Sequence, residues 1–272
     1  MVYVLFFLKA LWYTLGAVVV CGLCVSLLRG LFIRMMGDGA GRGVVMATSI
    51  LGTPVHELGH AAMCLVFGHK ITDMSLWQPV SRDHRLGYVT HAYSPRNIYH
   101  ILGNLFIGIG PIFSGLGVLT LALWLGFPET FSAYMSTASG MAADGAGFFA
   151  LLLEGLKMLP RMLEELVFGT STPLWGRIIA LVIILAVARH VSLSPEDIKG
   201  ALTAIPLYLG LILILSVVCG LLGTGVMETV SGGLARFSAY LTALFLIVLV
   251  SAFLQLLIAL PVWGARMLFG RR

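Results

Sequence analysis

The feature that most constrains this chain is a series of apolar segments, most of them long enough to cross a lipid bilayer. A helix needs about 20 predominantly apolar residues to span the hydrocarbon core. Six segments reach or approach this length, although polar residues interrupt the second and the fourth is short. We therefore expect an all-α polytopic membrane protein with about six transmembrane helices, built as one membrane-embedded domain over residues 1–272. The segments are residues 3–28, 44–68, 98–126, 174–190, 196–222 and 235–262.

The composition agrees with the membrane class. Charged residues make up 11% of the chain, whereas soluble domains average about 25%. The formal net charge is +5, but the basic residues are scattered at segment ends and form no basic face, which argues against a nucleic-acid partner. The expected partner is the lipid bilayer. We expect a multi-pass integral protein of a bacterial-type plasma membrane, and the distribution of Lys and Arg favours cytoplasmic termini.

Two connections between the apolar segments have a recognisable character. Residues 37–43, GDGAGRG, read as a glycine-rich linker. Residues 70–94 are rich in β-branched and aromatic residues on either side of the turn-like residues 81–84, which predicts a β-hairpin. An isolated hairpin is marginally stable in water, so this one is expected to lean on the helices as a small membrane-associated unit.

Two later segments predict helices outside the bilayer core. Residues 144–168 carry charged side chains at helical spacing opposite an apolar face, which predicts an amphipathic helix on the membrane, kinked at Pro160. Ser194 is suited to cap a helix, because Pro195 follows it at the first helical position and acidic residues occupy the first turn.

The second apolar segment contains the sequence His56-Glu57-Leu58-Gly59-His60, an HExxH motif. Positions i and i+4 share one face of a helix, so His56 and His60 can bind one Zn²⁺ ion together. Glu57 lies about 100° around the helix and can approach a zinc-bound water as a general base without binding the metal. Pro54 is expected to kink or restart the helix, and Gly59 to mark a close approach by another helix or a ligand.

A chance match is a poor explanation in so apolar a segment. A charged residue at the centre of a membrane helix costs about 2.5–3.5 kcal/mol on insertion scales. No basic residue lies within one helical turn of Glu57. A bound metal offsets the cost of burying the two histidines and the glutamate together, whereas the alternative is a buried cluster satisfied by hydrogen bonds alone.

The motif and its surroundings resemble the site-2-protease-like intramembrane zinc metalloproteases. The form HELGHA is common in that family, and residues 103–123 are similar to the family span that contains Gly-Pro-x-x-Asn. Gly110 and Pro111 are present here, but Ser114 or Gly115 stands where the asparagine would fall. The predicted hairpin also fits the family. The resemblance covers about residues 45–125 and, more loosely, residues 190–205.

The resemblance implies a third zinc ligand, an aspartate in an Asp-Gly pair at the start of a later helix. Asp144 precedes a glycine but lies in a polar loop, whereas Asp197 lies at a helix start, two residues before Lys199-Gly200. His190 ends an apolar segment seven residues earlier and is chemically a better zinc ligand. Both stay open, because Asp197 can instead serve a helix cap and His190 can be a hydrogen-bonded interface residue. Glu154 is a more distant candidate.

Several further side chains are candidates for work beside the metal. His91, in the predicted second strand, could steady the oxyanion that forms during hydrolysis, as could Tyr88 or Tyr93. The strand edge could hold an extended peptide. Asn104, in an otherwise apolar helix, could orient a ligand or join two helices. His84 and Arg85 are expected to be solvated turn residues.

These features lead to three functional hypotheses. The first is an intramembrane zinc metalloendopeptidase that hydrolyses peptide bonds of membrane-anchored or transmembrane substrates, with Glu57 as general base. The second is a zinc-binding membrane protein without catalytic activity, such as a scaffold or regulator, which the missing Asp-Gly pair and the altered Gly-Pro-x-x-Asn favour. The third is a metal transporter, which requires further ligands aligned across the bilayer.

Overall fold

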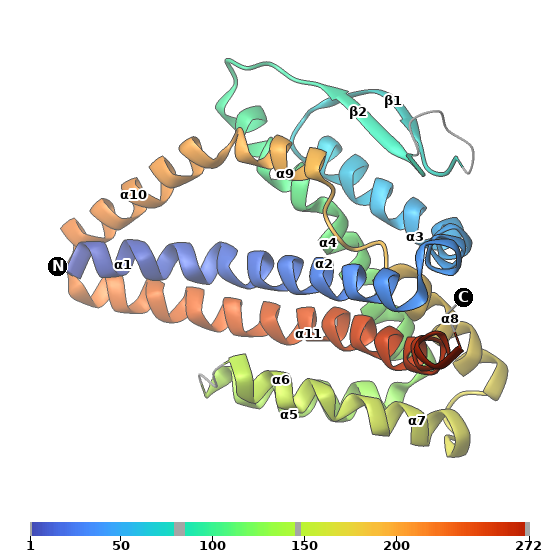
Figure 1. Ribbon diagram of the computed structural model, residues 1–272. Helices are drawn as coiled ribbons and strands as arrows, with labels where there is room; N and C mark the ends of the chain where they lie inside the picture. The colour runs from blue at the N-terminus through green and yellow to red at the C-terminus, as the bar shows by residue number, and fades with distance from the viewer. Residues whose placement is uncertain (1, 79–84, 145–147, 270–272) are drawn as a thin grey trace.

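The computed structural model describes residues 2–78, 85–144 and 148–269 (Figure 1). The described chain is almost entirely helical, with one small two-stranded sheet. Its helical elements, in order, are α1 (Val2–Leu11), the π-helical turn η1 (Trp12–Gly16), α2 (Ala17–Met36), α3 (Asp38–Val66), α4 (Ile98–Gly126), α5 (Pro128–Ala143), α6 (Phe148–Leu156), α7 (Met158–Phe168), α8 (Leu174–Ala188), α9 (Pro195–Leu202), α10 (Ile205–Leu222) and α11 (Thr224–Phe269).

Four stretches of the described chain are long and apolar enough to cross a membrane, so the structure indicates an integral membrane protein but does not support six spans. Two of the predicted segments fall short. Residues 44–68 lie mainly in α3, whose polar residues lower its hydropathy, and residues 174–190 form α8, which has only 15 helical residues. The four candidate spans are Val2–Met36, Ile98–Gly126, Ile205–Leu222 and Thr224–Leu268.

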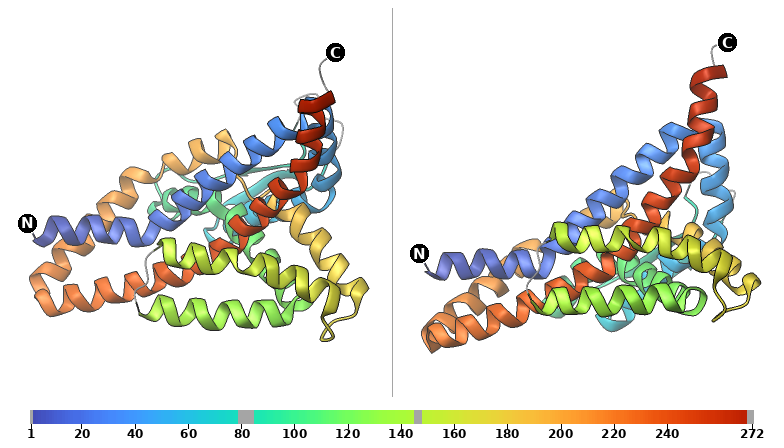
Figure 2. Two further views of the ribbon diagram at one scale, coloured as in Figure 1. Left: turned by 60° about the horizontal axis from the view of Figure 1, so that its bottom comes forward. Right: turned by 90° about the horizontal axis from the view of Figure 1, so that it is seen from below.

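The long helices define the frame that carries the site. The continuous helix α1–η1–α2 packs along α11, and the two run side by side for most of their length (Figure 1). Helices α5, α6 and α7 pack against one side of this pair, as the two views in Figure 2 show. Helices α3, α4 and α9 lie on the other side, below the hairpin. The start of α1 and the end of α11 lie at opposite ends of the molecule.

The predicted hairpin is present. Strands β1 (Lys70–Ser75) and β2 (Tyr88–Ala92) pair antiparallel, with Ile71 opposite His91 and a register irregularity between Ile71 and Asp73. The predicted turn at residues 81–84 lies outside the described residues. The hairpin follows α3 directly, because Gly68 adopts a left-handed φ of 69° that ends the helix. The sheet therefore lies over α3 and beside α4, as expected for a hairpin that cannot stand alone.

Two segments differ from the sequence expectation. The predicted linker 37–43 is mostly helical, because only Gly37 breaks the chain, with φ 78°, and α3 begins at Asp38. Gly41 lets this first turn approach α2, since a Cβ there would lie 3.3 Å from the carbonyl oxygen of Ile33. Helix α3 then continues through Pro54 without restarting.

The predicted amphipathic helix 144–168 is two helices, α6 and α7. The break falls at Lys157 and not at Pro160. Pro160 lies in the first turn of α7, where the backbone N–H has no partner within the helix, so proline costs little there. Residues 145–147 lie outside the described residues.

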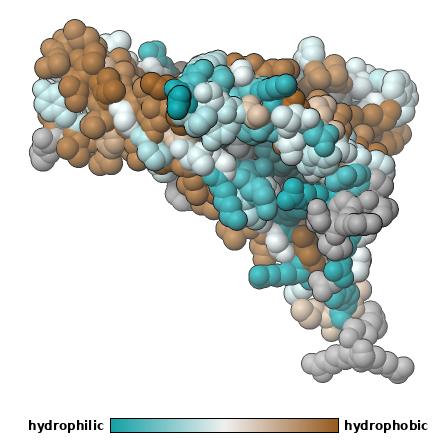
Figure 3. All heavy atoms as spheres, turned by 90° about the horizontal axis from the view of Figure 1, so that it is seen from above, coloured by the Kyte–Doolittle hydropathy of each residue, from teal (hydrophilic) through white to brown (hydrophobic). Residues whose placement is uncertain are grey.

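The surface polarity changes along the molecule. Seen from above Figure 1, the surface over the hairpin is largely hydrophilic, whereas the tip formed by α1, α10 and the start of α11 is hydrophobic (Figure 3). On α10, Leu213 is 54% exposed and Leu221 is 80% exposed. Such side chains are suited to lipid, so the two ends of the molecule are matched to different surroundings.

Candidate metal centre

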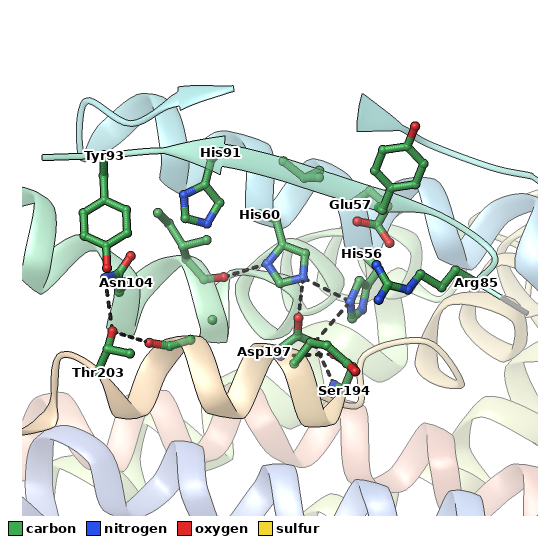
Figure 4. A pocket seen from close by; sticks show the side chains of 16 residues that line it. His56, Glu57, His60, Arg85, His91, Tyr93, Asn104, Ser194, Asp197 and Thr203 are labelled. Atoms are coloured by element: carbon green, nitrogen blue, oxygen red, sulfur yellow. Dashed lines mark hydrogen bonds and ion pairs between the residues drawn. The ribbon is translucent and has the colours of Figure 1, made fainter. Parts of the chain in front are cut away.

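Two elements bring three potential metal ligands together. Helix α3 places His56 and His60 one turn apart on one face, and the start of α9 places Asp197 beside both imidazoles (Figure 4). His60 Nε2 lies 3.1 Å from Asp197 Oδ1, and His56 Nε2 lies 3.6 Å from Asp197 Oδ2. The two Nε2 atoms are 3.2 Å apart. Residues separated by about 140 positions in the sequence thus converge on one point.

Hydrogen bonds to the backbone fix which nitrogen of each imidazole faces that point. His56 Nδ1 lies 2.8 Å from the carbonyl oxygen of His190, and His60 Nδ1 lies 2.7 Å from that of Ile107. A carbonyl oxygen only accepts, so both Nδ1 atoms carry the proton. In the neutral rings, each Nε2 then presents a lone pair. Two lone pairs and a carboxylate facing one another repel unless a cation lies between them.

The spacing of the three atoms fits a tetrahedral zinc ion. Ligands about 2.0–2.1 Å from zinc at tetrahedral angles lie about 3.3 Å from one another. The observed separations of 3.1, 3.2 and 3.6 Å bracket this value. Within residues 2–78, 85–144 and 148–269, His56, His60 and Asp197 form the only group of three such side chains close enough to share a metal. Protonated Nδ1 atoms bonded to carbonyls are also the usual outer-shell support of zinc-binding histidines.

Asp197 serves the helix cap and the cluster together. Its Oδ2 accepts a 2.6 Å hydrogen bond from the backbone N–H of Ser194, and its own N–H donates to Ser194 Oγ, which completes a capping box. The cap holds the carboxylate in place and leaves Oδ1 facing His60. Burial raises the pKa of Asp197, but hydrogen bonds from His56 and His60 and the positive charge of these imidazoles, when they are protonated, lower it below its ordinary value. The carboxylate is therefore ionised, as a metal ligand must be.

The other candidates for a third ligand lie elsewhere. The His190 ring is directed to Thr48, whose Oγ1 lies 3.1 Å from its Nε2, so this residue meets the cluster only through its carbonyl oxygen. Asp144 is exposed at the end of α5. Glu154 is buried in α6 and paired with Lys157 at 2.7 Å. In the described structure, His190, Asp144 and Glu154 each lie outside the group of potential metal ligands that His56 and His60 form with Asp197.

Glu57 lies next to the two histidines in α3 and is 6% exposed. Its carboxylate lies at the edge of the same cavity, close to His56 (Figure 4). The hairpin packs directly on it at Gly87, where a Cβ would lie 2.8 Å from Glu57 Cγ and 2.7 Å from Thr53 Cγ2. A side chain at position 87 would therefore collide with the glutamate. No local sequence pattern indicates this role of Gly87, because it depends on how the hairpin folds back.

The three potential ligands lie at the base of a cavity of about 390 Å³. The hairpin covers it from above, and α4 and α9 close its sides (Figure 4). Arg85 is exposed, as the sequence predicted, and it also lines this cavity. Its partner in that prediction, His84, lies outside the described residues. The remaining lining residues are mainly polar: Tyr88, Val89, His91, Tyr93, Asn104, Ile107, Gly108, Ser194, Glu196, Gly200 and Thr203.

His91 extends from β2 into the cavity (Figure 4). His69 contacts the His91 ring. His69 is 4% exposed; its Nε2 donates to the carbonyl oxygen of His100 at 2.8 Å, and its Nδ1 lies 3.0 Å from His91 Nδ1. Burial lowers the pKa of both His69 and His91. In the neutral rings His69 Nδ1 is therefore the acceptor and His91 Nδ1 the donor. The Nε2 of His91 is left as a lone-pair acceptor.

The other candidates beside the metal have partners of their own. The Tyr88 hydroxyl donates to Asp73 on the opposite strand at 2.8 Å. Tyr93 stacks on His69, with ring centroids 5.0 Å apart. Asn104 donates to Thr203 Oγ1 at 3.1 Å and so joins α4 to the end of α9, the second of its two expected roles.

Comparisons of the chain with protein-family models, with curated proteins and with solved structures gave no match. The functional argument therefore depends on the residues of the site and their geometry.

Proposed function

We propose that the protein is an intramembrane zinc metalloendopeptidase, similar in its chemistry to the site-2-protease-like family. The observation that carries the proposal is the convergence of His56 Nε2, His60 Nε2 and the Asp197 carboxylate in a cavity that Glu57 also lines. His56 and His60 hold Nδ1 on backbone carbonyls, and the pKa of Asp197 is low, so these three side chains have forms that can bind zinc. Asp197 is our proposed third ligand, and His190 acts as a positioning residue through its carbonyl oxygen.

Different residues of the chain have different roles in the proposed hydrolysis. Zinc bound to these ligands supplies Lewis acidity and a coordinated water of pKa about 7. Glu57 accepts a proton from the attacking water and passes it to the leaving amine. Burial of Glu57 beneath Gly87 fixes its position at the rim. The carbonyl oxygens of His190 and Ile107 keep both imidazoles oriented for the metal throughout.

The number of ligands favours an enzyme over a structural zinc protein. Structural zinc sites are closed by four protein ligands, whereas catalytic sites keep one position open. The described residues offer three. They also offer no second group of metal ligands along the helices, which a transport path would need. The three side chains line the cavity, through which a peptide would reach a metal held there.

For the oxyanion of the reaction we propose Arg85 in place of His91. Neutral His91 presents a lone pair at Nε2, which repels an oxyanion. This nitrogen can instead accept a hydrogen bond from a peptide N–H. The Arg85 guanidinium donates hydrogen bonds at any physiological pH. It reaches the cavity near His56 and Glu57 (Figure 4), and makes no ion pair in the described structure.

The substrate class follows from the setting of the cavity. It lies among membrane helices and beneath a hairpin whose strand β2 pairs with β1 along one edge. The second edge of β2 could hold an extended peptide by strand addition. We infer that the substrate is a membrane-anchored or transmembrane peptide that is unwound near the site. A bacterial-type plasma membrane and cytoplasmic termini stay predictions from the sequence.

The test compares wild type, Glu57→Gln and Glu164→Gln in proteoliposomes with a quenched fluorescent peptide that contains one transmembrane helix. Glu164→Gln is the control, because this glutamate is exposed on α7 and distant in sequence from the site. Glu57→Gln is expected to keep its zinc, measured by elemental analysis, and to lose cleavage by about 10²–10⁴-fold. The control is expected to match wild type.

Two outcomes would decide against the proposal. Equal cleavage by wild type and Glu57→Gln removes the proposed mechanism. Stoichiometric zinc in a wild-type protein that cleaves no peptide favours the non-catalytic zinc-binding alternative.

A further inference from the structure

A second polar cluster lies between α2 and the segment that follows α8. Arg189, at the end of α8, is 4% exposed. Its guanidinium carbon lies 3.6 Å from the centroid of the Phe32 ring, so one face of the guanidinium is covered by an aromatic side chain. Its Nε and Nη1 atoms are buried and have no hydrogen-bond partner among the residues that the structure describes. A buried cation is rarely left with unused donors.

A second guanidinium lies beside the first. Arg29 of α2 is partly buried, and its Nη1 donates to Ser192 Oγ at 2.5 Å. Burial lowers the pKa of Arg189 to about 10, with a smaller contribution from the positive charge of Arg29. Among the described residues, neither arginine has a carboxylate within 4.0 Å. Two like charges are therefore held together in a poorly hydrated place with no negative partner from the described chain.

Burial of an unpaired cation is strongly unfavourable, and a second cation nearby adds repulsion. An aromatic face offsets only a part of this cost. An anion between the two guanidiniums removes both penalties together. Guanidinium groups bind phosphate oxygens in a planar, two-point manner, and a serine hydroxyl can add a further hydrogen bond.

We propose that Arg29, Arg189 and Ser192 form a binding site for a phosphate group. Phe32 holds the plane of Arg189 from one side, which leaves the edge with Nε and Nη1 to face the ligand. The partial exposure of Arg29 provides the approach. The ligand is a phosphate monoanion or dianion, carried by a lipid headgroup or free in solution.

The surroundings of this cluster are also basic. Arg266 of α11 donates to the carbonyl oxygen of Met35, near the end of α2, at 3.0 Å. Basic residues near the ends of membrane helices attract anionic headgroups. This end of the α2–α11 pair is therefore suited to concentrate phosphate-bearing lipids near the two buried arginines.

The site is separate from the proposed zinc centre, so its test needs neither zinc nor peptide cleavage. The thermal unfolding midpoint of the full chain in detergent micelles is measured for wild type, Arg189→Gln and Arg34→Gln. Arg34→Gln is the matched control, because it removes an exposed arginine from the same helix. Each protein is titrated with inorganic phosphate, with phosphatidylglycerol, and with an uncharged galactolipid that carries no phosphate.

We expect phosphate or phosphatidylglycerol to raise the midpoint of wild type and Arg34→Gln by about 5 °C at saturation. Arg189→Gln is expected to show less than a third of that rise. A response to inorganic phosphate identifies a free anion as a sufficient ligand, and a response to phosphatidylglycerol alone identifies a lipid headgroup.

The proposal is overturned if neither phosphate source shifts the wild-type midpoint, if the galactolipid shifts it as much as phosphatidylglycerol does, or if Arg189→Gln responds like wild type. Should Arg189→Gln fail to fold, Ser192→Ala keeps both charges and removes one hydrogen-bond donor. It is expected to bind phosphate about 10-fold more weakly, and an unchanged affinity in this variant counts against the proposal.

Discussion

At the scale of single residues, the site is built from side chains that each make two directed contacts. His56 and His60 use Nδ1 for a backbone carbonyl and turn Nε2 toward the cluster. Asp197 uses Oδ2 for the cap at Ser194 and turns Oδ1 toward His60. Each side chain is therefore oriented before any metal binds, which lowers the entropic cost of assembling the site.

The first prediction separates a ligand from a positioning residue. Asp197→Ala removes a proposed ligand and is expected to weaken zinc binding by more than about 100-fold, beyond the 10–100-fold that outer-shell partners usually cost. His190→Ala keeps the carbonyl oxygen that orients His56, so it is expected to weaken binding by about 10-fold or less. Competition with a zinc chelator measures both affinities. The reverse order would make His190 the ligand.

At the scale of elements, the site depends on how closely α3 and α4 approach. A Cβ added at Gly59 would lie 2.6 Å from the carbonyl oxygen of Gly110, and one added at Gly110 would lie 2.5 Å from that of Gly59. The expectation that Gly59 marks a close helix contact is confirmed. Small residues serve this purpose in membrane proteins, where van der Waals contact between helices replaces the hydrophobic effect.

The glycines of α4 allow close contact with more than one neighbouring element. A Cβ added at Gly103 would collide with Phe67, just beyond α3, whereas one added at Gly108 would lie 2.6 Å from the carbonyl oxygen of Asp197. Gly108 therefore allows α9 to bring its aspartate next to the histidines. The same helix α4 thus holds both the motif helix and the element that completes the cluster.

The second prediction tests this contact with two glycines of one helix. Gly59→Ala forces a methyl group against the backbone of α4 and is expected to destabilise the protein by about 1–3 kcal/mol. Gly43→Ala, at a position of α3 with no atom within 4 Å of the added Cβ, is expected to be neutral or to stabilise by up to about 1 kcal/mol. Thermal unfolding in micelles measures both. Equal effects would show that α3 and α4 are not in close contact.

At the scale of the whole molecule, a polar site and a lipid-suited tip lie at different places. The hydrophilic surface lies over the hairpin, and the hydrophobic surface covers α1, α10 and the start of α11 (Figure 3). This division lets water reach the cavity, which is lined by the hairpin, α3, α4 and α9. Hydrolysis needs such access, because the attacking water must be replaced after each cycle.

The third prediction tests the division by cysteine labelling. The natural cysteines Cys21, Cys64 and Cys219 are buried, and Cys24 is partly buried, so the background labelling is expected to be low. Leu213→Cys, in the middle of α10, should resist a charged maleimide in intact membranes, since lipid covers it. Cysteine in place of the exposed Arg96, between the hairpin and α4, should react at least about 10-fold faster. Comparable rates would place α10 in water.

The sequence by itself determined the helical membrane class, the hairpin and the helical placement of His56 and His60 one turn apart. These features depend on local periodicity and hydropathy, which a single segment carries in full. The count of about six spans is not confirmed, because hydropathy over a window does not separate a helix with polar residues, such as α3, from one that faces lipid. The break at Lys157 was misplaced at Pro160, since a proline is tolerated in the first turn of a helix.

Only the tertiary structure decided which distant residues meet. Asp197 and His190 were equally open from the sequence, but the packing of α4 against α9 brings the aspartate to the histidines, while Thr48 holds the His190 ring away. Arg85, Gly87 and the buried pair Arg29 and Arg189 gave no local signal, because their roles come from contacts across the chain. Such contacts are set by the close packing of whole helices, and no window of sequence contains both partners.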